Sequence, residues 1–162
     1  MSLLKSIQDG EGKTVEFKVE LPNSNTLAKT IIAFSNTGGG KLIIGVNDQG
    51  EIIGLEPDVN IFELKDKVAS IIYETCYPTV LPDIYTTTID DQLLLIIEVY
   101  RGNLLPYYLK NKGKNEGVYI RVGATNRKAS HENILELERQ RMNISFDQEA
   151  NREVELDSLD IS

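Results

Sequence analysis

Basic and aromatic side chains concentrate in residues 101–128, and these are the side-chain types that bind phosphates and bases. The segment holds seven bases against the single acid Glu116, a net charge of +6. Lysine and arginine contact phosphates, and tyrosine rings stack on unpaired bases. The tyrosines of this segment are Tyr107, Tyr108 and Tyr119. The combination predicts a nucleic-acid-binding surface; the alternative is a solvated, lysine-rich loop beside tyrosines that pack inward.

Any such surface must be local, because the 162-residue chain carries a formal charge of −8 and this excludes a uniformly basic coat. The body of the domain is nearly neutral, since residues 147–162 hold six acids and one base, a net of −5. The predicted binding residues join the basic segment to two earlier lysines. They are Lys18, Lys41, Lys110, Lys112, Lys114, Arg121, Arg127 and Lys128.

Cysteine and histidine chemistry is excluded by counting. The chain has one cysteine, Cys76, and one histidine, His131, so it forms no internal disulfide and no Cys/His zinc site. Any metal must therefore bind to carboxylates. The glycines of residues 38–40 suggest a phosphate loop, but they follow a predicted helix and lead into a strand, which is the reverse of a phosphate cradle. We interpret them as a helix stop.

Length and composition indicate one folded domain with a single sizeable core. Apolar residues make up 41% of the chain, yet no run is long enough to cross a bilayer and the first residues do not resemble a secretory signal. We therefore expect a cytoplasmic protein without membrane contact. Residues 1–146 form the predicted domain, and residues 147–162 an acidic tail or a linker to a C-terminal region. A sharper hypothesis is that the tail docks on the basic segment and competes with nucleic acid.

Hydrophobic periodicity supplies the elements that position these side chains. Helical spacing predicts helices near 26–35 and 61–74, and Ser130 is a candidate N-cap for a last helix. Alternating or continuous apolar runs predict strands. They cover residues 14–19, 41–46, 51–55, 84–89, 93–100 and 118–122.

The order of these features resembles the AlbA-2 domain of Schlafen-like proteins, a module of many bacterial transcriptional regulators. The resemblance spans roughly residues 11–137. The matching stretches are Glu16-Phe17-Lys18, Ala33 to Gly40, Ile43 to Asp48 with Gly50, Ile53-Gly54-Leu55, Pro106, and Tyr119 to Thr125. The resemblance implies an α+β fold with a mixed, mainly antiparallel sheet and flanking helices. It also implies nucleic-acid association and a regulatory context.

The resemblance also implies a possible catalytic site, because some animal relatives cut RNA with a metal held by carboxylates. Glu16 and Asp48 fall on matched positions, and Glu11 stands five residues ahead of Glu16, as an acid does in those relatives. Three carboxylates can hold magnesium or manganese and activate water. Five residues along one strand would place Glu11 and Glu16 on opposite faces, however. The cutting relatives also use two lobes, whereas this chain has one.

Three functions stay open from the sequence. The leading hypothesis is a DNA-binding module of a transcriptional regulator, without catalysis and without a cofactor, whose partner is DNA or RNA. The first alternative is a magnesium- or manganese-dependent ribonuclease that uses Glu11, Glu16 and Asp48. The second is a dimerisation or scaffold domain. A homodimer is expected in the leading case, because it doubles the small platform that one lobe offers to a duplex.

Overall fold

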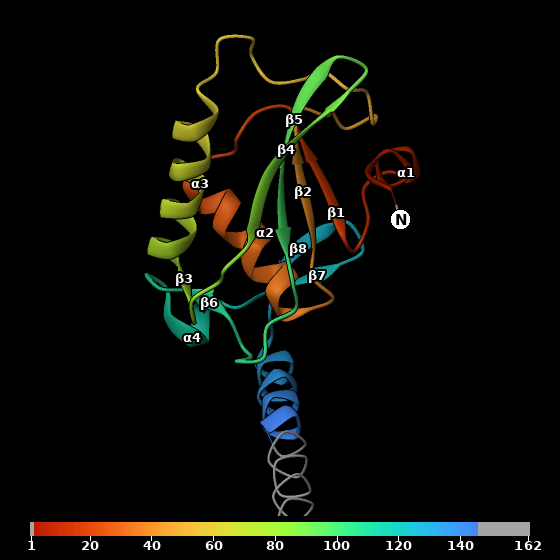
Figure 1. Ribbon diagram of the computed structural model, residues 1–162. Coiled ribbons are helices and arrows are strands. Elements are labelled where there is room, and N and C mark those ends of the chain that lie inside the picture. The colour runs from red at the N-terminus through yellow and green to blue at the C-terminus, as the bar shows by residue number, and fades with distance from the viewer. Residues whose placement is uncertain (1, 146–162) are drawn as a thin grey trace, which may run out of the picture.

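A four-stranded sheet forms the centre of the domain (Figure 1). The computed structural model describes residues 2–145, so the predicted acidic tail and its docking lie outside the described residues. The strand order is β1-β2-β5-β4; β1 and β2 run parallel, and the other neighbours are antiparallel. The strands are β1 (Val15–Lys18), β2 (Gly40–Ile44), β4 (Asp83–Ile89) and β5 (Gln92–Val99). This arrangement confirms the predicted α+β class.

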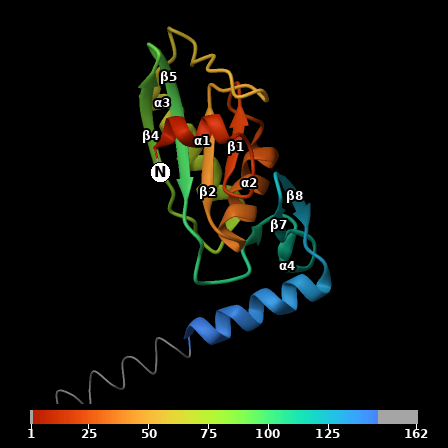
Figure 2. The same ribbon diagram turned by 90° about the vertical axis from the view of Figure 1, so that its right-hand side faces the viewer.

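Both faces of the sheet are buried, which explains the continuous apolar runs in its two central strands. Along β2, Leu42 and Ile44 belong to the larger hydrophobic cluster, whereas Ile43 belongs to the smaller one on the opposite face. The larger cluster is covered by α2 (Ser24–Asn36) and α3 (Ile61–Thr75). The short helix α1 (Leu3–Asp9) crosses the other face, as Figure 2 shows.

Helix α2 is the main buried helix, and its ends follow from the sequence. The Asn23 side chain accepts a hydrogen bond from the Thr26 amide and caps the first turn. At the other end, the amide of Gly39, at φ +75°, donates to the Phe34 carbonyl at 2.9 Å. A Cβ atom on Gly40 would lie 2.6 Å from the Phe34 ring. The glycines therefore end helix α2, as the sequence predicted. The missing side chain of Gly40 also leaves space for the Phe34 ring.

Two small ribbons complete the fold. Strands β3 (Cys76–Tyr77) and β6 (Tyr108–Leu109) pair beyond the end of α3, next to α4 (Gly113–Glu116). Strands β7 (Tyr119–Val122) and β8 (Thr125–Lys128) form a hairpin that packs against α2. A last helix covers residues 131–145 and extends away from the body (Figure 2). No helix within residues 2–145 is long and apolar enough to cross a membrane.

The structure corrects some of the predicted elements. The strand expected over 51–55 is reduced to one isolated bridge between Val46 and Ile52, because the turn at Asn47 leads into an irregular connection. Ser130 does cap the last helix, since its hydroxyl accepts from the Asn133 amide at 3.1 Å. Hydrophobic periodicity did not predict the short elements α1, α4, β3, β6 and β8.

Burial gives Cys76 a predictable reactivity. Its side chain is buried within the larger cluster, and burial raises the pKa of the thiol to about 11. Since the thiolate is the nucleophile, we expect the folded protein to react with a thiol reagent at pH 8 at least about 100-fold more slowly than a free cysteine. The reaction should become fast in urea. Fast labelling of the native protein would contradict the buried position.

Candidate nucleic-acid interface

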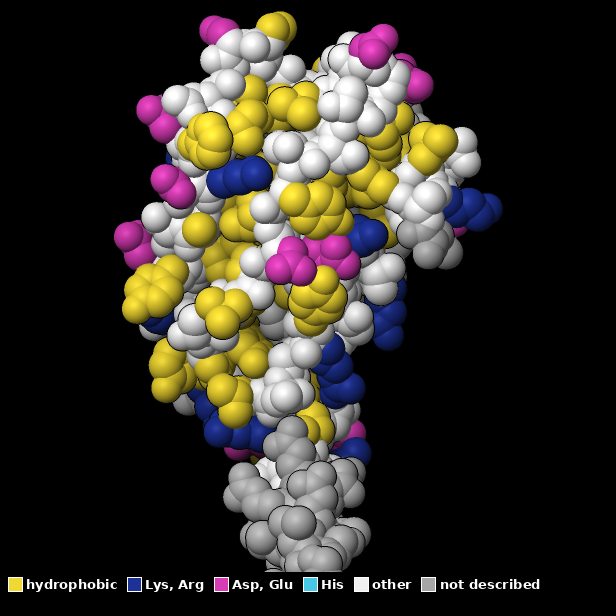
Figure 3. Space-filling view, viewed as in Figure 1, with side chains coloured by type: hydrophobic (Ala, Val, Ile, Leu, Met, Phe, Trp, Pro, Cys, Tyr) yellow, Lys and Arg dark blue, Asp and Glu magenta, His cyan; other side chains and the backbone are white. Residues whose placement is uncertain are grey.

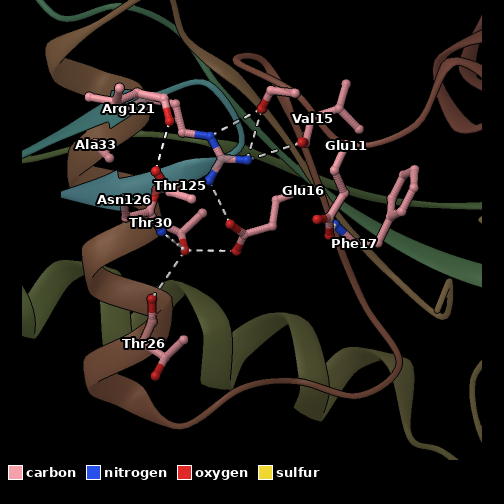
Figure 4. Close-up of polar contacts among 12 residues, drawn as sticks. Glu11, Val15, Glu16, Phe17, Thr26, Thr30, Ala33, Arg121, Thr125 and Asn126 are labelled. Carbon is pink, nitrogen blue, oxygen red and sulfur yellow. Dashed lines mark hydrogen bonds and ion pairs between the residues drawn. The ribbon is translucent and has the colours of Figure 1, made fainter. Parts of the chain in front are cut away.

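A buried polar network joins the hairpin to the sheet and to α2 (Figure 4). Arg121 Nη1 lies 2.6 Å from Glu16 Oε1, and the two side chains are 0% and 10% exposed. The second carboxylate oxygen accepts from the Thr30 hydroxyl at 2.9 Å, and Thr30 in turn accepts from the Asn126 amide at 2.9 Å. The network thus ties together β1, α2, β7 and β8.

All five N–H groups of the Arg121 guanidinium find acceptors inside the protein. Nη1 donates to Glu16 and to Asn126. Nε donates to the Gly12 carbonyl, and Nη2 donates to the carbonyls of Gly12 and Val15. Arg121 therefore has no donor left for a phosphate. This corrects the sequence-based interpretation, which placed Arg121 among the nucleic-acid contacts; its role here is to fix the hairpin.

Strand periodicity explains how the two charges come to be buried together. Val15 and Phe17 belong to one face of β1, so Glu16 between them faces the other side, towards α2. In the hairpin, Arg121 and Asn126 are cross-strand partners and share the face that packs on α2. The ring of Phe34 lies 5.1 Å from the guanidinium carbon. The pair is satisfied and enclosed, as a buried ion pair must be.

Asn36 makes a second buried connection. Its side-chain nitrogen donates to the carbonyls of Tyr107 at 2.9 Å and Tyr119 at 2.8 Å. Its side-chain oxygen accepts from the Tyr107 amide at 2.7 Å. One side chain at the end of α2 thus holds both the segment before β6 and the start of β7. Within residues 2–145, no buried side-chain nitrogen or oxygen lacks a partner.

The three predicted catalytic carboxylates do not form a metal site. Both oxygens of Glu16 are engaged by Arg121 and Thr30. Glu11 accepts from the Phe17 amide at 2.9 Å, and Asp48 is exposed in the turn after β2. Among the described residues, no three Asp, Glu, His or Cys side chains are grouped to hold a metal ion. The arrangement does not fit magnesium or manganese at these positions, and we derive no metal-dependent step.

An open cleft of about 390 Å³ lies beside this buried network. It is formed by the segment before β1, the end of α2, the segment after β5, strand β7 and the helix over 131–145. Its lining residues are Lys13, Asn36, Thr37, Gly38, Arg101, Ile120, Asn133, Glu136, Leu137 and Gln140. The cleft therefore brings basic and amide side chains from distant parts of the chain to one concave surface.

The cleft is locally basic although the protein is acidic. Lys13 and Arg101 line it, and Arg101 donates to the Gln140 side chain. Its acidic lining residue is Glu136, whose pKa is lowered to about 2 by hydrogen bonds from Arg139 and Gln140. Because Arg139 donates to both Glu136 oxygens, the negative charge there is offset. In the sequence, Arg101 contributes only to the charge of the basic segment. Lys13 was not among the predicted binding residues, because the residues around Lys13 form no basic cluster.

Among the predicted basic residues, Arg127 lies on the same side of the hairpin as the cleft. It is the cross-strand partner of Ile120, which lines the cleft, and cross-strand partners share one face. Arg127 is exposed, and its Nε donates to the Thr125 hydroxyl at 3.2 Å. Lys112 is also exposed, at the N-cap of α4.

The other predicted lysines are more dispersed. Lys114 pairs with Glu138 at 2.9 Å, and Lys128 pairs with Glu116. Lys18 and Lys41 emerge on opposite faces of the sheet, because Lys41 lies beside Val15 in the register and Lys18 follows Glu16 in the alternation. They do not extend one continuous patch with the hairpin.

The three tyrosines of the basic segment also differ in exposure. Tyr107 is buried, and its hydroxyl accepts from the Leu104 amide at 3.3 Å. The ring of Tyr119 is half-buried, with Lys29 Nζ 5.1 Å from its centroid. Tyr108 is half-buried beside Tyr77. Lys110 lies over another tyrosine, Tyr73, with Nζ 5.4 Å from the ring centroid.

Several solved structures share this fold, including one from Corynebacterium diphtheriae and one from Nitrosomonas europaea. The DIP2311 protein from Corynebacterium diphtheriae has 24% sequence identity and a TM-score of 0.56, over 78% of this chain and 24% of that protein. The N-terminal domain of a protein related to the ATP-dependent DNA helicase RecG, from Nitrosomonas europaea, has 23% identity and a TM-score of 0.55. That match covers 79% of this chain and 91% of the domain. This chain thus spans about a quarter of the Corynebacterium protein.

No curated protein matches the sequence. The family described as "Schlafen, AlbA_2" matches residues 11–130, which include all four strands of the central sheet and the β7–β8 hairpin. The match covers well over half of the chain and agrees with the resemblance seen in the sequence. The chain belongs to the Schlafen AlbA-2 family.

Proposed function

We propose that this domain is a DNA-binding module of a cytoplasmic transcriptional regulator and that DNA phosphates bind at the cleft and the adjoining face of the β7–β8 hairpin. The observation that carries the proposal is that Lys13 and Arg101 line one concave surface, while exposed Arg127 is the cross-strand partner of Ile120 at its edge. Lysine and arginine at such a surface replace the counterions of a phosphate backbone. The amides of Asn133 and Gln140 add neutral hydrogen-bonding groups to it.

Membership of the family and similarity to a domain of a helicase-related protein both support a nucleic-acid function. The Schlafen AlbA-2 resemblance implies nucleic-acid association, and the Nitrosomonas domain belongs to a protein related to a DNA helicase. We include a homodimer in the proposal, because one cleft meets only a short stretch of backbone, whereas two copies related by a two-fold axis can meet two.

The test is fluorescence anisotropy of the 162-residue protein with a labelled DNA duplex across a salt series. We expect affinity to fall with rising salt, because each phosphate contact releases counterions. Lys13→Ala, Arg101→Ala and Arg127→Ala should each weaken binding and reduce the slope of log K against log salt by about 1. The titration end point also gives the number of protein copies on each duplex.

A matched control is Lys5→Ala. Lys5 is an exposed lysine on α1, paired with Asp9 at 3.6 Å, on the sheet face opposite α2. Its loss removes the same charge from the protein but none from the cleft, so binding and salt slope should stay at the wild-type values. Equal losses from Lys5→Ala and from the three cleft variants would mean that only net charge matters, and the proposed site would be wrong.

A further inference from the structure

A second surface combines exposed rings with a lysine at the end of α3. Tyr73 is 65% exposed and Tyr77 is 51% exposed, although large aromatic side chains are usually covered. Tyr108 and Lys110 lie beside them. We call Tyr73, Tyr77, Tyr108 and Lys110 the tyrosine platform. Figure 3 shows hydrophobic and basic side chains gathered over this part of the molecule, at the lower left.

The backbone holds the platform in place. Tyr77 and Tyr108 are cross-strand partners of β3 and β6, and their ring centroids are 5.5 Å apart at an interplanar angle of 47°. Lys110 directly follows β6, and its Nζ lies over the Tyr73 ring. Its backbone amide donates to the Thr75 carbonyl at 2.9 Å, and its Nζ donates to the Tyr73 carbonyl at 3.1 Å. The rings and the cation therefore come from one rigid junction.

The charge around the platform differs from the charge around Tyr100, the other tyrosine with a largely exposed ring among the described residues. The Tyr100 hydroxyl donates to Asp83 at 2.8 Å, and the nearby Tyr85 hydroxyl donates to Glu98 at 2.9 Å. These carboxylates repel a phosphate backbone. At the platform the ammonium of Lys110 lies 5.4 Å from the Tyr73 centroid, and exposed Lys112 follows two residues later.

The surface next to the platform has room for a planar ligand. A groove of about 430 Å³ lies between α3 and the start of β4. Tyr73 lines it together with Val80, Leu81 and Pro82, and Glu74 is the acid on its rim. Exposed rings and an adjacent cation are the features that hold unpaired nucleotides, because every base has a π-face and every backbone link carries a negatively charged phosphate.

We infer that the tyrosine platform binds unpaired bases of a single-stranded nucleic acid by stacking on Tyr73 and Tyr77, while Lys110 contacts the backbone. The inference rests on the proposed nucleic-acid function and extends it: the cleft binds backbone phosphates, and the platform selects segments whose bases are accessible. An exposed ring cannot stack on bases that are paired inside a duplex, so the two surfaces have different ligands.

The experiment uses the 162-residue protein and three labelled probes: a 15-nucleotide thymidine strand, an abasic strand of the same length, and a duplex. Wild type should bind the thymidine strand at least about 5-fold more tightly than the abasic strand, given the usual contribution of one stacked base. Tyr73→Ala/Tyr77→Ala should remove that preference and leave duplex binding unchanged. For the thymidine strand, the salt slope of Tyr73→Ala/Tyr77→Ala should match that of wild type. Lys110→Ala should lower that slope by about 0.7, because it removes one contact to a single-stranded backbone.

Tyr100→Ala is the control, because it deletes an equally exposed ring from an acidic setting; it should keep the preference for bases. The inference is overturned if wild type binds the thymidine and abasic strands equally, or if Tyr73→Ala/Tyr77→Ala keeps the preference. It is also overturned if that variant only loses self-association, which would assign the platform to a second copy of the chain. If the proposed binding of duplex DNA at the cleft is wrong, the result is separate: the wild-type protein does not bind the duplex probe.

Discussion

Arg121→Ala is expected to lower the free energy of unfolding by about 3–5 kcal/mol, because the change leaves the Glu16 carboxylate buried without its counter-charge. Glu16 is 7% exposed, and Arg121 supplies one of its two hydrogen-bonding partners at 2.6 Å. The carbonyls of Gly12 and Val15 lose donors at the same time. Urea denaturation monitored by circular dichroism measures the loss.

Arg127→Ala is the matched control for stability. Arg127 belongs to the same hairpin but is exposed, so its removal should change the free energy of unfolding by less than about 0.5 kcal/mol. The Glu16→Ala/Arg121→Ala double variant should lose less than the sum of the two single variants, because the partners interact directly. Equal stability of Arg121→Ala and Arg127→Ala would refute the buried network.

The two arginine variants should also differ in the salt dependence of their binding to the DNA duplex. Arg127→Ala removes a proposed phosphate contact from a stable protein, so its salt slope should fall by about 1. Arg121→Ala weakens the fold instead, and protein that is still folded at low temperature should keep the wild-type slope. A lower slope for folded Arg121→Ala would restore the sequence-based interpretation that Arg121 contacts nucleic acid.

Asn36→Ala is the second change with a large expected effect, a loss of about 3–5 kcal/mol in the free energy of unfolding. The Asn36 side chain makes three hydrogen bonds to buried backbone groups of Tyr107 and Tyr119. Alanine leaves all three groups without a partner, and each buried, unsatisfied group costs about 1–3 kcal/mol before relaxation. Thermal and urea denaturation give the change directly.

The control for this variant comes from the same helix. Asn25 is exposed in the first turn of α2, and alanine there should leave stability within about 0.5 kcal/mol of wild type. If Asn36→Ala lost no more than Asn25→Ala, water would have to replace the side chain at all three backbone groups. That result would contradict the role of Asn36 as the connection between α2, the segment before β6 and β7.

Much of the fold was predictable because its larger elements bury wide apolar faces. The helix expected over 61–74 is α3, and the strands around Asp90 and Asp91 are β4 and β5, joined by a turn in which both aspartates have positive φ. The short elements were not predictable: α1 and the two-residue strands β3 and β6 contain too few residues to show a period. Their positions depend on tertiary contacts such as the Cys76–Leu109 pairing.

The candidate site was predicted less well, because charge in a sequence does not reveal burial. Arg121 alternates with apolar residues as an exposed strand residue would. Its burial depends on the Glu16 carboxylate and on backbone acceptors of Gly12 and Val15, which are distant in the sequence. Lys13 and Arg101 meet at the cleft through the sheet and the helix over 131–145. The family resemblance implied that Glu11, Glu16 and Asp48 form one site. In the described residues Glu11 instead accepts from the Phe17 amide and Glu16 pairs with Arg121, and the three carboxylates are not grouped to hold a metal ion.

The enclosure of the Arg121–Glu16 pair decides how binding curves at different ionic strengths should be read. Added salt weakens attraction between exposed charges over about 10 Å at 0.1 M, but it acts far less on a pair that solvent does not reach. The hairpin wall of the cleft is held by such a pair, so the spacing of that wall should persist across the whole titration. A change of affinity with salt then reports ions displaced from the ligand, free of any contribution from a loosening scaffold.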